Sequence, residues 1–88
     1  MNKPELGIKV TAVKPLKGGK LLVTFFTGEK RLFDTTKLQG SAFAPLADER
    51  IVNEPTLFHG VITWMNGEID IAPETVYQGS CAYEEEAV

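Results

Sequence analysis

Few residues of this chain could support chemistry. His59 is the only histidine and Cys81 the only cysteine among the 88 residues. A catalytic histidine needs a nucleophile or an orienting acid beside it. Glu54 and Asp70 are conceivable partners of His59, but nothing in their spacing requires such a pairing. Cys81 lies in a stretch of Ala, Tyr and Glu without the basic neighbour that usually activates a thiol. The sequence therefore predicts no catalytic residue.

Metal and phosphate sites are not indicated either. A transition-metal site takes three or four ligands, and one histidine and one cysteine far apart do not supply them. Asp70 and Glu74 lie four residues apart, where both can favour the start of a predicted helix. Gly18-Gly19 is not followed by the Gly-Lys-Ser/Thr of a phosphate-binding loop. We predict a protein that is not an enzyme and that binds no cofactor and no metal.

Length and composition indicate one small domain over residues 1–88, with an ordered core over residues 7–79 and a frayed acidic tail over residues 80–88. A single cysteine cannot form an internal disulfide, which small secreted domains usually need. No apolar run is long enough to span a membrane, and residues 1–7 have no apolar stretch typical of a signal peptide. We therefore expect a cytoplasmic protein that does not bind membranes.

The first half of the chain has β-strand patterns. Residues 8–13 alternate in polarity, and Pro15 is expected to end that strand. Residues 20–26 are apolar on both faces, which is typical of a central strand that is covered on both sides. Residues 29–34 return after a Thr-Gly turn. Together these segments predict a three-stranded antiparallel meander.

The second half combines short helices with a hairpin. Asp34 and Asp48 are good helix caps in a middle region of broken helical turns. Residues 56–64 read as one strand with a bulge at Gly60, and Asn66-Gly67 predicts a type I′ turn. A last helix begins at Pro73. The predicted fold class is α+β: an antiparallel sheet made of the meander and a C-terminal hairpin, with short helices.

Several motifs together carry a family resemblance. They are mostly turn, cap and core residues: Val13-Lys14-Pro15-Leu16, Leu22-Val23-Thr24-Phe25, Arg31-Leu32-Phe33-Asp34, Phe43-Ala44-Pro45-Leu46, residues 60–64, Asn66-Gly67 and residues 70–77. In these the chain resembles the bacterial family catalogued as domain of unknown function 2442. The resemblance implies a small α+β fold and a gene context like that of toxin–antitoxin pairs. It further implies an antitoxin-like role and a small protein partner encoded nearby. The helix-turn-helix of longer members is not expected here.

Charge is distributed unevenly along the chain. Residues 1–40 carry eight basic and three acidic side chains, whereas residues 41–88 carry one basic and nine acidic, for a net charge of −3. This polarity can provide a basic face for an anionic partner. It can also mean that the two halves pair across the fold, or head-to-tail between copies. The overall acidity favours pairing, because an acidic domain is a poor phosphate binder.

The combined interpretation is a non-catalytic protein-interaction or regulatory module. Its predicted partner surface comprises a basic first hairpin and an apolar region: Lys14, Lys17, Lys20, Lys30 and Arg31, with Phe43, Leu46 and Trp64. Trp64 is expected to be partly exposed. One alternative is a nucleic-acid-associated regulator that uses the same basic hairpin, and another is a small enzyme that uses His59. A homo-oligomer is also plausible, because sheet edges and complementary charges favour association.

Overall fold

Two antiparallel sheets form the framework of the computed structural model, which describes residues 8–83. The strands of the first sheet, in spatial order, are β1 (Val10–Leu16), β2 (Lys20–Phe25), β3 (Lys30–Asp34) and β7 (Cys81–Ala82). The strands of the second are β4 (Thr56–Phe58), β5 (Val61–Trp64) and β6 (Ile69–Ile71). The helices are η1 (Lys17–Gly19), η2 (Thr35–Lys37), η3 (Ser41–Ala47), α1 (Glu49–Val52), η4 (Met65–Gly67) and α2 (Pro73–Gly79). The predicted α+β class is confirmed.

The predicted meander of β1, β2 and β3 is confirmed, but its first strand is longer than expected. Pro15 does not end β1, which continues to Leu16, and Pro15 pairs with Leu21 of β2. Proline is tolerated here because β1 is an edge strand of its sheet, where a missing N–H need not break a ladder. A glycine turn at η1 then reverses the chain, with both glycines at positive φ.

The second sheet corrects two turn predictions. Residues 56–64 are not one bulged strand, because His59 and Gly60 both have positive φ (53° and 81°) and join β4 to β5 as a hairpin. The predicted hairpin between β5 and β6 is confirmed. Its loop, however, spans four residues between Trp64 and Ile69, with positive φ at Met65 as well as at Asn66-Gly67. It is therefore not a two-residue type I′ turn.

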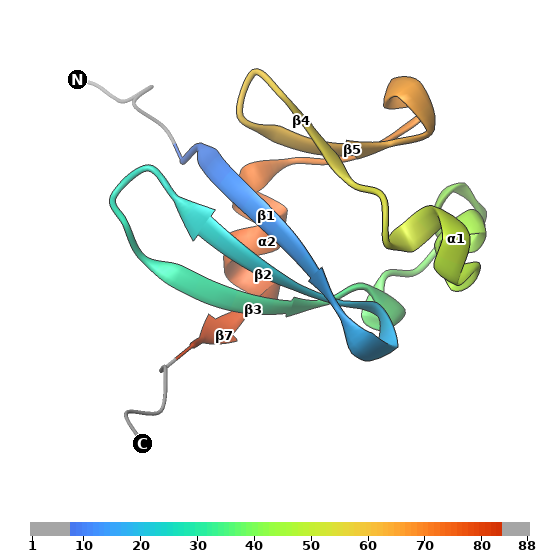
Figure 1. Ribbon diagram of the computed structural model, residues 1–88, viewed down its shortest axis with the longest axis horizontal. Helices are drawn as coiled ribbons and strands as arrows, with labels where there is room; N and C mark the ends of the chain where they lie inside the picture. The colour runs from blue at the N-terminus through green and yellow to red at the C-terminus, as the bar shows by residue number, and fades with distance from the viewer. Residues whose placement is uncertain (1–7, 84–88) are drawn as a thin grey trace.

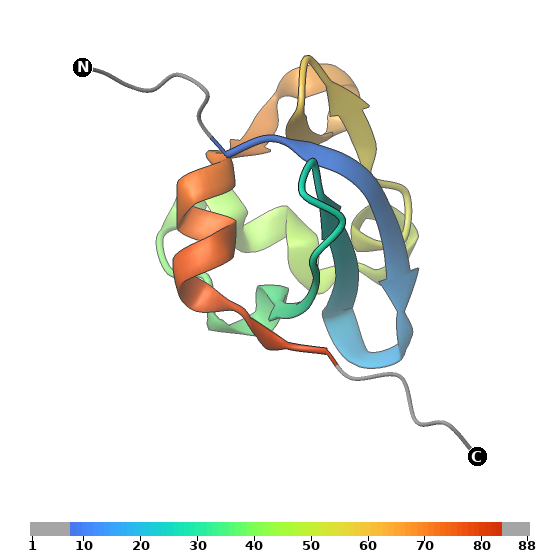
Figure 2. The ribbon, with the colours of Figure 1, turned by 90° about the vertical axis from the view of Figure 1, so that its left-hand side faces the viewer.

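Helix α2 covers one face of the first sheet. It lies behind β1, β2 and β3 in Figure 1 and to one side of them in Figure 2. Val76 of α2 is fully buried, and a Cβ at Gly79 would lie 3.1 Å from the ring of Phe33, so the helix end packs closely on β3. The core between helix and sheets consists of Val10, Leu21, Val23, Phe25, Phe33, Leu46, Val52, Ile62, Trp64, Ile69, Ile71 and Val76.

The middle segment is capped as predicted. Asp34 accepts hydrogen bonds from the hydroxyl and the backbone N–H of Thr36, at 2.6 and 2.9 Å, and these bonds lower the pKa of the Asp34 carboxyl. Asp48 accepts from the backbone N–H of Arg50 at 2.9 Å and begins the four-residue helix α1. Among the described helices, none is both long and apolar enough to cross a membrane.

The ordered structure extends beyond the predicted boundary at residue 79. Cys81 and Ala82 pair with Leu32 and Arg31 as β7, and the N–H of Tyr83 donates to the carbonyl of Lys30 at 3.2 Å. The rest of the predicted acidic tail, residues 84–88, lies outside the described residues. The meander thus gains a fourth, very short edge strand.

Candidate interaction surface

The first sheet has one face that α2 does not cover. Strand register places alternate residues on it, opposite the buried Leu21, Val23 and Phe25. We call this surface the lysine face; it consists of Ala12, Lys14, Leu16, Lys20, Leu22, Thr24, Lys30, Leu32, Asp34 and Cys81. In Figure 1 no described helix or strand lies in front of β1, β2 and β3.

The lysine face has an apolar centre and a basic rim. Leu22 and Leu32 pair directly across β2 and β3 and are half-buried. Lys14 pairs with Leu22 from β1, while Lys20 and Lys30 lie at opposite ends of the face, and all three are exposed. Protein interfaces combine an apolar centre with a polar rim in the same way. No helix or strand of residues 8–83 covers this face, so for the described residues the expectation that residues 20–26 are covered on both sides is wrong.

The charges of the two chain halves do not neutralise each other through ion pairs within residues 8–83. The ion pairs of this region are Glu29–Arg31 at 2.8 Å and Asp48–Arg50 at 3.0 Å. Each joins residues that are two positions apart, so neither links the basic half to the acidic half. The interpretation that the halves pair across the fold is wrong for these residues. Within residues 8–83, no ion pair ties a lysine of the first half to a carboxylate of the second.

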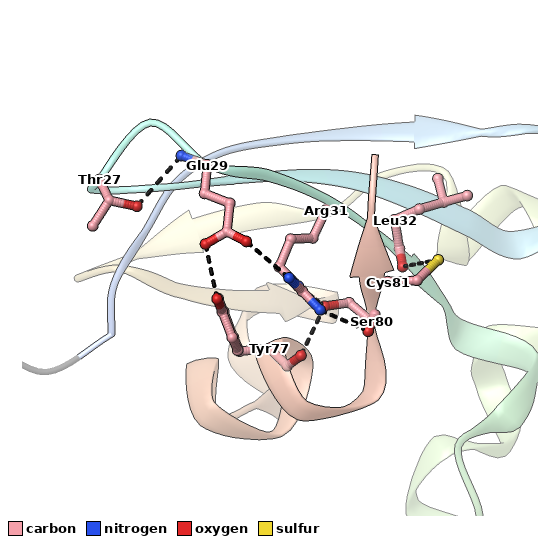
Figure 3. Close-up of polar contacts among 7 residues, drawn as sticks. All are labelled: Thr27, Glu29, Arg31, Leu32, Tyr77, Ser80 and Cys81. Carbon is pink, nitrogen blue, oxygen red and sulfur yellow. Dashed lines mark hydrogen bonds and ion pairs between the residues drawn. The ribbon is translucent and has the colours of Figure 1, made fainter. Parts of the chain in front are cut away.

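Arg31 is held by the chain itself and not offered to a partner. Figure 3 shows its guanidinium bonded to Glu29 (2.8 Å), to the hydroxyl of Ser80 (2.6 Å) and to the carbonyl of Ser80 (3.0 Å). It also lies 4.3 Å from the ring centroid of Tyr77. Its side chain is only 16% exposed. Its assignment to the partner surface is therefore wrong, because odd-numbered residues of β3 face α2.

Tyr77 closes this network. Its hydroxyl donates to Glu29 at 2.8 Å, and its ring packs edge-on against Phe25 with centroids 5.2 Å apart. The bond from Tyr77, together with the single bond and the positive charge of Arg31, lowers the pKa of the Glu29 carboxyl. The same bond to Glu29 raises the pKa of the Tyr77 hydroxyl. The network fastens the end of α2 to β3 and so positions β7 at the edge of the lysine face.

The apolar part of the predicted partner surface is mostly buried. Phe43 is half-buried beside a hollow of about 250 Å³ between η2 and η3, but Leu46, which also lines that hollow, is a core residue. Trp64 is 0% exposed, and its Nε1–H donates to the carbonyl of Val52 at 3.1 Å. The expected exposure of Trp64 is wrong because strand alternation places it beside Ile62 on the core face.

The remaining predicted residues lie at the surface. Lys17 is exposed in η1, at the end of the β1–β2 hairpin. His59 lies at an exposed turn, and the centroid of its ring lies 4.2 Å from that of Phe58. Cys81 is exposed on the lysine face. Within residues 8–83, no three metal-ligating side chains gather into one group.

Leu22 and Leu32 are the residues of the site that the sequence interpretation missed. The signal was present, because a strand that is apolar on both faces must bury one face and can offer the other. Without the position of α2, the sequence pattern could not show which face of the strand is buried and which is at the surface. Phe26, just after β2, is likewise 55% exposed.

Comparison with known proteins gives one family match. The model of a family described as "Protein of unknown function (DUF2442)" matches residues 10–81. No curated protein and no solved structure matches the chain.

Proposed function

Because the chain belongs to this family of unknown function, we propose its function from its own surface: a non-catalytic module that binds an acidic segment of a partner protein on the lysine face. The observation that carries the proposal is the half-buried Leu22–Leu32 pair, which no described helix or strand covers, with exposed lysines around it. Apolar side chains of the partner would pack on the leucines, and carboxylates would meet the lysines. An antitoxin-like role, in which the module occupies a small protein encoded beside it, fits this mode of binding.

The composition of the lysine face favours protein over nucleic acid. Its strand positions carry no arginine and no aromatic ring within β1, β2, β3 and β7. Nucleic-acid-binding sheets use such groups to stack bases and clamp phosphates. Asp34 also faces outward directly beside Lys20 and would repel a phosphate there. These features support a partner with both apolar and acidic side chains.

Co-expression with the product of the adjacent gene, followed by titration of the purified proteins, tests the proposal. The double variant Lys14→Gln/Lys30→Gln removes two charges from the face, and its matched control, Lys9→Gln/Lys17→Gln, removes two lysines outside it. We expect the first variant to weaken binding about tenfold and the control about twofold or less, since rim charges act mainly on nearby groups. Equal losses in both variants, or none in either, would contradict the assignment.

A mixed-sequence oligonucleotide serves as the competing ligand. Binding to DNA or RNA would fall steeply with salt, because phosphate neutralisation releases counterions. Tight oligonucleotide binding with such a slope, abolished by Lys14→Gln/Lys30→Gln, would replace the protein-binding proposal by the nucleic-acid alternative. Weak or absent binding at low salt would leave the protein partner as the ligand of this face.

A further inference from the structure

The second sheet also has an outer face, and a hollow lies on it. Strand alternation turns Ile62, Trp64, Ile69 and Ile71 toward the core. The opposite face has a hollow of about 390 Å³ lined by Phe58, Thr63, Asn66 and Gly67. Phe58 is 65% exposed, the most exposed large apolar side chain among those described. Its ring therefore protrudes beside a concave surface.

Three carboxylates lie at positions next to the lining residues, along the chain or across the sheet. Asp70 pairs with Thr63 across β5 and β6, and Glu68 directly follows Gly67 in the chain. Glu54 lies just before β4, whose Thr56 side chain bonds that of Thr63 at 2.9 Å. All three acids are exposed. We call this surface, the four lining residues with Glu54, Glu68 and Asp70, the acidic hollow.

The acidic hollow and the lysine face are complementary in two respects. One has a protruding Phe58 within a rim of carboxylates, and the other has the Leu22–Leu32 pair within a rim of ammonium groups. Neither rim is neutralised by an ion pair from the other half of the chain within residues 8–83. Exposed aromatic residues that fill a partner's apolar surface are typical anchors of interfaces.

We propose that the acidic hollow of one copy binds the lysine face of a second copy. The two surfaces lie on different sheets, so one copy cannot bring its own pair together. The contact is head-to-tail, and each added copy leaves one lysine face and one acidic hollow free. Association therefore continues to chains or a closed ring instead of stopping at a symmetric dimer. It also occupies the face that the proposed function assigns to a partner protein, so self-association and partner binding exclude each other.

Sedimentation velocity over a series of protein concentrations tests the contact. In about 50 mM salt we expect the average mass to rise with concentration. In about 500 mM salt we expect the mass of a single chain, because screening weakens exposed ion pairs. A mass that stays at one chain throughout the series at low salt would overturn the proposal.

Two neutralising variants give the decisive result. Glu68→Gln/Asp70→Asn removes the charges of the acidic hollow, and Lys14→Gln/Lys30→Gln removes those of the lysine face. Each alone should weaken self-association about tenfold, since each removes two rim charges. Mixed in equal amounts they retain one intact surface each, so they should form a two-chain complex and nothing larger.

A matched control and the partner assay separate the possible outcomes. Glu49→Gln/Glu74→Gln makes the same charge change on α1 and α2, outside the hollow, and should self-associate like the unmodified chain. A dimer that persists in both neutralising variants would place the contact elsewhere and overturn the proposal.

Glu68→Gln/Asp70→Asn keeps the lysine face, so it should still bind the partner protein. Loss of partner binding would contradict the proposed function, whereas loss of concentration dependence alone would contradict only this inference.

Discussion

Replacing Trp64 with phenylalanine should lower the free energy of unfolding by about 2–3 kcal/mol. Trp64 is fully buried, and its indole N–H bonds the carbonyl of Val52, which joins β5 to the end of α1. Phenylalanine leaves that carbonyl without its donor inside the core, a loss of about 1–2 kcal/mol. The smaller ring also leaves a void, which adds about 1 kcal/mol.

Urea denaturation followed by far-ultraviolet circular dichroism measures this change without the indole as a probe. A domain of 88 residues has a total stability of about 4–13 kcal/mol, so the loss is a large share of it. The melting temperature should fall by about 10–20 °C. The slope of the free energy of unfolding against urea concentration should stay the same, since the variant exposes the same surface area on unfolding.

Met65→Ala is the neighbouring control, because Met65 is 42% exposed and its truncation should change stability by about 0.5 kcal/mol or less. A Trp64→Phe variant that loses less than about 0.5 kcal/mol would refute the assigned burial and hydrogen bond. A Trp64→Phe variant with unchanged stability that no longer binds a partner would also refute this assignment. In that case Trp64 would belong to the interaction surface, as the sequence analysis expected.

Two further predictions concern the His59 turn and the network around Tyr77. Because His59 has positive φ, His59→Gly should keep or raise stability by up to about 1 kcal/mol, whereas His59→Val should lower it by about 1–2 kcal/mol in the same urea assay. Because folding lowers the pKa of Glu29, the stability that its carboxylate contributes is fully present above the usual carboxyl pKa range. That stability is lost as the pH falls through the pKa of Glu29 in the folded protein. Because folding raises the pKa of Tyr77, the stability that its hydroxyl contributes is fully present below the usual tyrosine pKa range. That stability is lost as the pH rises through the pKa of Tyr77 in the folded protein. Hydrogen-exchange protection of the Tyr83 amide should therefore decrease at both extremes, and Tyr77→Phe should remove the alkaline decrease; equal protection profiles for the two proteins would contradict this role.

Local signals in the sequence predicted the part of the fold that local physics determines. The meander follows from apolar alternation and glycine turns, and the caps follow from single side chains such as Asp34 and Asp48 bonding the next amides. These features need no information about distant parts of the chain. The family resemblance rests on turn, cap and core residues, and the match over residues 10–81 confirms it.

Other features depend on tertiary context and could not be predicted. Histidine at the first position of a tight hairpin turn is an uncommon choice, so Gly60 was interpreted as a bulge. The two-residue strand β7 has no pattern of its own and is held by the bonds of Arg31 to Ser80. Pro15 could remain in a strand only because β1 is an edge, and the sequence does not state strand order.

Only part of the candidate site could be predicted, because the position of its residues also depends on tertiary packing. Lys14, Lys20 and Lys30 do share one exposed surface. Arg31 was grouped with them by sequence proximity, although adjacent strand residues point to opposite faces. Whether Arg31 or its neighbours meet solvent depends on the face that α2 covers. That choice is made by packing, through Val76 and Gly79, and not by any pattern in residues 29–34.

The short range of the ion pairs bears on how this scaffold can diverge. In the part of the chain that the structure describes, both pairs join residues two positions apart, so no rim lysine or carboxylate supports the fold by pairing with a distant charge. The lysines and carboxylates that we propose for recognition are therefore not members of the ion pairs within residues 8–83. Duplicated copies could exchange their rim charges, acquire different partners and repel the old ones while the same core persists. Surface substitutions alone could therefore produce several copies of this fold that each bind their own partner and not the partners of the others.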